Sequence, residues 1–218
     1  MYIPDHFRPT DEDVAELLSN IRAADLVSAT ADGLLATMLP LIHEPPGAAA
    51  TDADAGNRGR LMGHVARNNR QWTVPPIGEA MVIVRGPDAY ISPAWYATKR
   101  EHGRVVPTWN YITAHVHGRL VIHDDAAWVE ANVRALTERH EASRAKPWSV
   151  DDAPLPYIDG QLRAIVGIEI VISRIEAKFK LSQNRSVADV DGAIAGLEAA
   201  SPLNRPTAEA MRAAREDR

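Results

Sequence analysis

The chain has 218 residues, 45% of them hydrophobic and 24% charged, a balance that permits one large globular domain or two small ones with a buried core. The formal net charge of −5 argues against a protein whose main task is to hold nucleic-acid phosphates, although a local basic patch is compatible with it. Because there is no cysteine, disulfides, thiolate metal sites and cysteine nucleophiles are excluded.

No targeting or membrane segment is predicted. The opening residues, MYIPDHFRPTDED, lack the apolar core of a secretory signal, and no apolar run approaches the length of a membrane span. We therefore expect a soluble, cytoplasmic protein without a membrane partner.

The first quarter of the chain predicts a helix followed by a β-hairpin. Thr10 is placed to cap a helix that opens with three acids, residues 11–13, which suit the positive helix start. Two β-prone runs then meet at Asp32-Gly33, a dipeptide that favours a tight hairpin turn. Residues 43–59 are rich in Pro, Gly, Ala and Asp and predict a flexible surface loop.

The middle of the chain predicts short strands and turns. Arg60–Val65 is expected to form a strand, followed by a short helix or turn in ARNNRQW. Strands at 79–85 and 89–91 are expected on either side of a Gly86-Pro87 turn. Ser92-Pro93 then suits the cap and the first position of a helical turn.

Two long strands and several helices are expected in the second half. Alternation from Val105 predicts a strand with Ile112, Ala114 and Val116 on its apolar face, and a helix should follow Asp124-Asp125. A Pro-rich connection at 146–160 leads to a second long strand. Its apolar parity changes near Ser173-Arg174, which predicts a β-bulge. Two helices are expected to close the chain, the first capped by Ser186 and the second beginning near Thr207.

These elements predict an α+β, mainly β fold, namely a closed or partly closed barrel with peripheral helices. The strands do not alternate one-for-one with helices, which argues against a doubly wound parallel sheet. We expect the barrel domain to span residues 1–185, with helices in 186–218 packed on it.

Residues 90–118 concentrate flat, polar-edged side chains in a chain with only 6% aromatic residues. The segment holds Tyr90, Trp95, Tyr96, Trp109 and Tyr111 beside Lys99, Arg100, Arg104, Asn110, His115 and His117. Aromatic rings beside cationic and hydrogen-bonding groups suit a planar, partly charged ligand or a subunit interface. The alternative is that these rings fill a hydrophobic core.

Two further patterns suit a phosphorylated heterocycle. In GRLMGHVARNNRQW, His64 ends a strand, and Arg67 and Asn68 sit at the start of the next helix, where free N–H groups favour a phosphate; a solvated turn is the alternative. In KFKLSQN, Lys178 and Lys180 share a strand face. The amides and hydroxyl that follow them would either read the edge of a heterocycle or only end the strand and cap a helix.

The HVH triplet is a weaker pattern. His115 and His117 share a strand face and would both reach a metal such as zinc or iron, with His64 joining them in space. Exposed or interface histidines are the favoured interpretation, because no carboxylate or third histidine follows at matching spacing. No Ser-His-Asp set can be assigned, and GxGxxG, Walker and helix-turn-helix patterns are absent.

Six motifs occur in the order found in the PaiB-like family of FMN-binding negative transcriptional regulators: MYIPDHF, GRLMGHVARNNRQW, YISPAWY, VPTWNY, HVHG and KLSQN. The chain resembles that family from Met1 to about Met211. It departs from it in an Ala/Asp/Gly-rich insert at 47–57 and in Asn69, where the family often has proline. The resemblance implies a split β-barrel of the flavin-reductase and pyridoxine-phosphate-oxidase type, a homodimer, and FMN between the subunits.

The resemblance also implies where FMN would bind. It places the phosphate near His64, Arg67 and Asn68, supported by Lys180. It places the isoalloxazine ring against the backbone of Thr37, Met38 and Leu39 and against Trp109, Asn110 and Tyr111. Gln183 and Asn184 would reach the ring or the phosphate from the partner chain.

The family description implies negative regulation of sporulation and of degradative-enzyme (protease) genes. The acidic charge and the lack of a reading helix argue against direct DNA binding, so we expect an indirect regulator that senses flavin redox state, metabolites or a partner protein. An FMN-dependent oxidoreductase using NADH or NADPH is the alternative. A haem-binding or haem-degrading barrel, with His64, His115 or His117 on the iron, is another.

Overall fold

A computed structural model describes residues 1–47 and 58–216, and these residues form two compact units. We call Ala15–Val84 with His115–Ile175 the barrel unit, and Met1–Val14, Arg85–Ala114 and Glu176–Arg218 the extension unit. The expected organisation, a barrel domain over residues 1–185 with helices in 186–218 packed on it, stays a prediction. The C-terminal helices share a unit with the outer parts of three strands. Most of the expected loop at 43–59 lies outside the described residues, but His43 and Glu44 belong to a strand.

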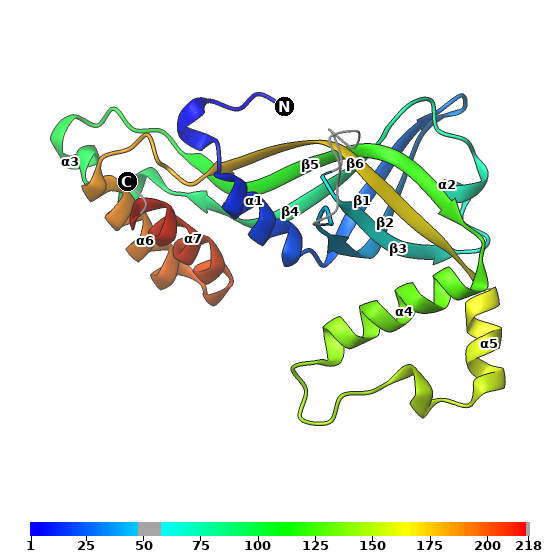
Figure 1. Ribbon diagram of the computed structural model, residues 1–218. Helices are drawn as coiled ribbons and strands as arrows, with labels where there is room; N and C mark the ends of the chain where they lie inside the picture. The colour runs from blue at the N-terminus through cyan, green and yellow to red at the C-terminus, as the bar shows by residue number, and fades with distance from the viewer. Residues whose placement is uncertain (48–57, 217–218) are drawn as a thin grey trace. The chain divides into compact units, whose positions relative to one another are not determined.

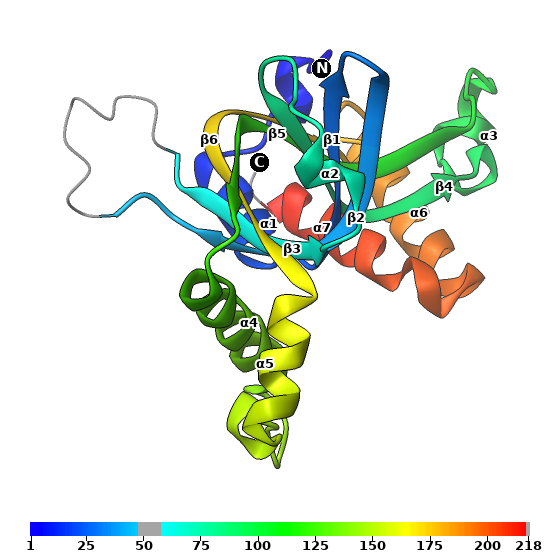
Figure 2. The ribbon, with the colours of Figure 1, turned by 90° about the vertical axis from the view of Figure 1, so that its right-hand side faces the viewer.

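Six strands close into a barrel in the order β1-β2-β3-β6-β5-β4 (Figure 2). They are β1 Ala23–Thr30, β2 Gly33–Glu44, β3 Arg60–Ala66, β4 Ala80–Ile91, β5 Thr108–His123 and β6 Ile165–Lys180. The pairs β1–β2, β1–β4, β2–β3 and β3–β6 are antiparallel. The expected mainly β barrel is therefore confirmed.

The predicted hairpin forms between β1 and β2. Thr30 pairs with Gly33 across Ala31-Asp32, and the Thr30 hydroxyl donates to the Gly33 carbonyl oxygen at 2.8 Å. Gly33 has φ of +113°, a region that residues with a Cβ rarely adopt.

Apolar side chains at alternate positions of the strands fill the barrel interior. Leu26, Val82 and Ile168 have no exposed surface, and in β5 the predicted apolar face is buried at Ile112, Ala114 and Val116. Burial along β6 changes parity where the bulge is expected. Val166, Ile168, Ile170 and Ile172 are buried, Ser173 and Arg174 are both exposed, and Ala177 is the next buried residue. The change of face is thus present, and the bulge geometry stays a prediction.

The expected turn at Gly86-Pro87 is wrong, because β4 runs unbroken from Ala80 to Ile91. Proline has no N–H to donate, but its fixed φ is compatible with extended backbone where no ladder bond is needed. The dipeptide lies just past the point where the strand leaves the barrel unit at Val84.

The helices of the described chain are α1 Asp11–Ser19, α2 Arg70–Thr73, α3 Thr98–His102, α4 Ala126–Glu141, α5 Leu155–Arg163, α6 Val187–Ala200 and α7 Arg205–Glu216. Short 3-10 turns lie at Asp5–Phe7, Pro93–Trp95, Val150–Asp152 and Pro202–Asn204. The expected caps are confirmed at Thr10, Ser92 and Ser186, and Asp125 caps the helix expected after Asp124-Asp125. Each of the four accepts a backbone N–H from the first turn that follows.

Helix α5 was missed, since residues 146–160 were expected to be a connection. Pro154 and Pro156 lie at its cap and first turn, where a proline without an N–H leaves no hydrogen bond unmade. Within the barrel unit α5 lies beside α4 (Figure 1). No helix of the described ranges, 1–47 and 58–216, is both long enough and apolar enough to span a bilayer.

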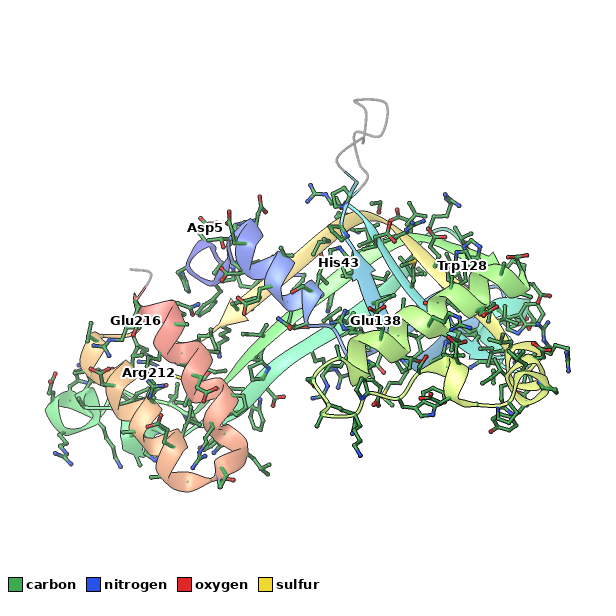
Figure 3. The ribbon with its side chains drawn as sticks, turned by 60° about the horizontal axis from the view of Figure 1, so that its bottom comes forward. Asp5, His43, Trp128, Glu138, Arg212 and Glu216 are labelled. Carbon is green, nitrogen blue, oxygen red and sulfur yellow. The ribbon has the colours of Figure 1, made fainter. Side chains whose placement is uncertain are left out.

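Helices α6 and α7 pack side by side in the extension unit (Figures 1 and 3). Arg212 pairs with Glu198 at 2.6 Å, and Arg215 pairs with Asp191 at 2.5 Å. On α6, Gly196 lies directly against the Trp95 indole, and a Cβ there would come within 2.2 Å of Trp95 Cδ2. The glycine therefore makes room for the ring.

We predict that Gly196→Ala destabilises the protein, although alanine is normally the better helix former. Overpacking against Trp95 should cost about 1–3 kcal/mol of unfolding free energy. Gly160→Ala on α5 is the matched control, because no atom lies within 4 Å of its added Cβ. It should stabilise by about 0.5–1 kcal/mol. Chemical denaturation of both variants checks the pair, and a stabilising Gly196→Ala would contradict the packing described.

Candidate functional site

The residues predicted to bind a ligand fall into two groups, one in each compact unit. The barrel unit holds Thr37, Met38, Leu39, His64, Arg67 and Asn68. The extension unit holds Trp109, Asn110, Tyr111, Lys180, Gln183 and Asn184.

The three residues of β2 face alternate sides of the barrel wall. Thr37 pairs with buried Leu26 and faces the interior, as does Leu39, which is 2% exposed. Met38 is 72% exposed on the outer face. Met38 is thus the exposed side chain of the three, and the expected contact of a flavin ring with their backbone stays a prediction.

The Thr37 hydroxyl belongs to a buried polar network that the sequence did not reveal. It donates to Gln71 Oε1 at 3.1 Å, and Gln71 Nε2 donates to the Ser28 hydroxyl at 2.8 Å. Gln71 is 1% exposed, and its backbone N–H donates to Asn69 Oδ1 at 2.8 Å. The N-cap of α2 is thus tied to β1 and β2. The sequence signal for this network was Asn69, a residue type that commonly caps helices. Glutamine is normally exposed, so the burial of Gln71 was not expected.

Arg67 is engaged within the protein. Its guanidinium pairs with both Asp124 oxygens at 2.6 and 3.2 Å, and it also donates to the carbonyl oxygens of Arg163 and Ile165. This bidentate pair raises the pKa of Arg67 and lowers the pKa of Asp124. Asn68 beside it is exposed. A phosphate at Arg67 would have to displace the Asp124 carboxylate.

A hollow of about 520 Å³ opens beside this ion pair, between the start of α4 and α5. Its charged lining residues are Arg67, Arg163, Asp124, Asp125, Glu130 and Asp159. Four carboxylates against two guanidiniums give this wall an excess of negative charge. That excess disfavours a phosphate dianion.

His64 lies on the outer side of β3, against α4. Its Nδ1 is 3.3 Å from the Asn132 amide nitrogen, and burial lowers its pKa. A neutral ring that accepts from Asn132 is therefore favoured at neutral pH. His64 is fixed by its neighbour on α4.

A buried carboxylate that the sequence analysis did not single out also lies on β6. Glu169 is 7% exposed, and its oxygens lie 2.5 Å from His123 Nε2 and 3.5 Å from Arg60 Nη1. Trp128 stacks on His123 with the ring planes 4° apart. An acid inside the apolar run VGIEIVI was the available signal. Because both carboxylate oxygens have partners, the cluster has a structural explanation.

The weak metal alternative gains no support from the geometry. Within residues 1–47 and 58–216, no three or more histidine and carboxylate side chains come together as a metal site. His115 and His117 both have interactions within the protein.

In the extension unit, the Trp109 ring is both exposed and fixed. It is 51% exposed, and its Nε1 donates to Asp88 at 2.8 Å. Tyr90, 47% exposed, meets its edge with ring centroids 6.2 Å apart. A rigid, half-exposed indole is a surface on which a planar ligand can stack.

Two lysines flank the neighbouring Tyr111. Lys178 and Lys180 place their ammonium groups 5.7 and 6.0 Å from its ring centroid. Lys180 also donates to the Trp109 carbonyl oxygen at 2.6 Å and to the Thr108 hydroxyl. Burial, and next to it the charges of Lys178 and Arg185, lower the pKa of Lys180. The geometry thus places two cations beside the half-buried Tyr111 ring, on the strand face that also carries the exposed Trp109 indole.

The remaining residues of this group shape the turn after β6. Asn110 has no exposed surface and donates to the Ser182 hydroxyl at 2.9 Å and to the Met211 sulfur at 3.3 Å. Gln183 closes the turn, accepting from Leu181 N and donating to the Phe179 carbonyl oxygen, each at 2.7 Å. Asn184 is exposed. Asn110 and Gln183 therefore hold the backbone, whatever the turn binds.

The sequence matches a known family and several known proteins. Residues 1–174 match the family described as "Putative FMN-binding domain". The chain is 31% identical over 200 residues to "Protease synthase and sporulation protein PAI 2" of Bacillus subtilis, covering 91% of this chain and 89% of that protein. It is 33% identical over 187 residues to an uncharacterized protein of Emericella nidulans, covering 73% of each.

A solved structure shares the fold. The flavocytochrome Anf3 from Azotobacter vinelandii superimposes with a TM-score of 0.52 at 15% identity, covering 79% of this chain and 68% of that one. At this identity the likeness concerns the fold, and it supports the split-barrel architecture expected from the sequence.

We predict that His64 makes the protein acid-sensitive. Burial lowers its pKa below the ordinary 6.5, so the unfolded chain binds the proton more readily, and stability falls as the pH drops through and below that value. His64→Gln should flatten the fall in melting temperature between about pH 7 and pH 5. His140→Gln, an exposed site on α4, is the control and should leave the slope unchanged. Equal slopes in all three proteins would contradict this assignment.

Proposed function

Because the chain belongs to the FMN-binding domain family, we propose that it is an FMN-binding regulator of the PaiB type that acts indirectly, as a flavin-dependent sensor. Membership assigns FMN as the cofactor. The name of the Bacillus subtilis relative, with its protease synthesis and sporulation, supports a regulatory role, and the net charge of −5 favours action without direct DNA contact.

The aromatic and cationic surface of the extension unit carries this proposal. FMN needs a flat apolar surface for its ring and cations for its phosphate, and Trp109, Tyr111, Lys178 and Lys180 provide both kinds of group. Bound flavin would supply hydride and electron transfer. The task of these side chains is to bind and orient it.

FMN titration tests the binding. The protein as purified, or after addition of FMN, should show the visible flavin spectrum with quenched fluorescence. Trp109→Ala should weaken FMN binding roughly tenfold, because stacking on an aromatic ring contributes about 1–3 kcal/mol. Trp148→Ala removes a similarly exposed indole, at 46%, from the barrel unit and should leave the affinity unchanged. Wild-type protein that binds no flavin would overturn the proposal.

Two assays separate a sensor from other roles. FMN-loaded protein should not turn over NADH or NADPH steadily, and steady consumption would favour the oxidoreductase alternative. Gel-shift titration at low salt should show no operator binding. A specific shift there would replace indirect action by direct repression.

We further propose that the protein is a homodimer formed through the outer face of β1, β2 and β4. The pairing registers put ten side chains on this face: Leu34, Ala36, Met38, Pro40, Ala23, Asp25, Val27, Ala29, Met81 and Ile83. Nine of them are apolar, and Leu34 and Met38 are 76% and 72% exposed. Apolar faces of this extent mark interaction sites. A self-complementary, nearly uncharged surface suits a second copy.

We predict that Met38→Asp, alone or with Leu34→Asp, converts the dimer to a monomer, because each carboxylate would be buried without a partner. Light scattering after size-exclusion chromatography measures the mass. Leu203→Asp, at an 87% exposed site in the extension unit, is the control and should remain dimeric. A wild-type monomer would refute the dimer, and dimeric Met38→Asp, Leu34→Asp protein would refute this face.

A further inference from the structure

Three cations gather within eight residues at the end of β6 and the turn that follows. Lys178, Lys180 and Arg185 are all half-buried, so their side chains are partly removed from water. In the described part of the chain, none of the three forms an ion pair with a carboxylate. A charge that is partly removed from water gains from a partner of opposite charge. This group, which we call the cation cluster, has no such partner among the described residues.

Neutral groups hold the cation cluster in place. Lys178 lies 5.6, 5.7 and 5.7 Å from the ring centroids of Tyr2, Phe7 and Tyr111. Lys180 donates to the hydroxyl of Thr108 and the carbonyl of Trp109, and the Arg185 guanidinium lies 4.8 Å from the Tyr96 ring centroid. Rings and carbonyl groups orient a cation without cancelling its charge.

The carboxylates close to these elements have other partners. Asp189, buried at the start of α6, accepts from the Thr98 N–H at 2.9 Å and from its hydroxyl at 2.8 Å. Asp88 accepts from the Trp109 indole. Glu176, two residues before Lys178 on β6, pairs with the N-terminal ammonium of Met1 at 2.5 Å. Among the described residues, no carboxylate therefore neutralises the cluster.

Like charges within the cluster repel one another. After burial, the charges of Lys178 and Arg185 lower the pKa of Lys180. A bound anion beside these groups would relieve that repulsion. Arg67 offers the opposite case, since Asp124 already neutralises it.

We propose that the cation cluster binds the phosphate group of the ligand and that Arg67 does not. The ligand chemistry is a phosphate monoester attached to a planar ring. Its identity as FMN rests on the proposed function, whereas the anion site rests on the charges of the extension unit. This assignment moves the phosphate away from the loop after β3, where the sequence motif had placed it.

Comparing FMN with riboflavin, which lacks the phosphate, isolates the contribution of the phosphate to binding. Fluorescence titration gives the ratio of the two dissociation constants. Lys178→Gln and Arg185→Gln should each lower the wild-type preference for FMN roughly tenfold, the typical effect of a lost charge-assisted hydrogen bond. Riboflavin affinity should stay unchanged in Arg185→Gln and fall much less than FMN affinity in Lys178→Gln, whose side chain also contacts the Tyr111 ring. A circular dichroism spectrum like that of the wild type shows that both variants are folded. Lys180 is left intact because it also supports Thr108 and Trp109.

Two arginine variants serve as comparisons. Arg67→Gln should keep the FMN preference within about twofold of wild type, because its charge is already balanced. Arg100→Gln removes an exposed charge elsewhere in the extension unit and reports the long-range effect of net charge. Loss of the preference in Arg67→Gln, with retention in Lys178→Gln and Arg185→Gln, would overturn the inference and leave FMN binding in place.

Inorganic phosphate tests the anion site without any flavin. At equal ionic strength, phosphate should raise the melting temperature of the wild-type protein above its value in chloride. Lys178→Gln and Arg185→Gln should abolish that rise. If no flavin binds but this pattern holds, the proposed function fails and the anion site stands. If phosphate gives no rise over chloride in a wild-type protein that also shows no preference for FMN over riboflavin, the anion site is refuted.

Discussion

One hydrogen-bonded pair of buried side chains, Asn110 and Ser182, organises the extension unit. Ser182 has φ of +68°, a left-handed conformation that costs energy for a residue with a Cβ. The Asn110 amide donates to its hydroxyl at 2.9 Å, and the hydroxyl in turn lies 3.2 Å from Asn110 Oδ1. This bond redirects the chain from β6 toward α6. It thereby sets Lys180 before the turn and Arg185 after it.

The sequence motifs assigned two basic regions to one binding site. The two regions differ in whether a carboxylate of the chain neutralises their positive charge. Both contain basic residues between the end of a strand and the start of a helix, and helix N-termini favour a phosphate. Arg67 is paired with a carboxylate 57 positions away in sequence and lies beside a hollow lined by four acids. The lysines of β6 are oriented by rings instead, and rings leave the charge available. The same residue types thus have opposite capacities for a phosphate because of their neighbours.

Local chemistry made much of the fold predictable. Side-chain caps at Thr10, Asp125 and Ser186 and the alternation of β5 are short-range features, and the structure confirms them. Gly86-Pro87 led to the wrong prediction of a turn. Such a dipeptide favours a turn, but here the strand continues through it in an extended conformation. The Asp124 partner of Arg67 and the burial of Gln71 could not be predicted. Both depend on which strands close the barrel. That closure brings together residues far apart in the sequence, and local patterns do not reveal it.

A motif can therefore mark a fold without marking its ligand contacts. In GRLMGHVARNNRQW, Asn69 and Gln71 tie α2 to the barrel interior, His64 contacts α4, and Arg67 pairs with Asp124. In KLSQN, Ser182 and Gln183 shape the turn. The groups of such motifs that can bind a ligand are those whose hydrogen bonds or charges are not already satisfied within the chain. By that criterion the lysines beside Tyr111 and the exposed indole of Trp109 form the stronger candidate for binding a phosphorylated ring.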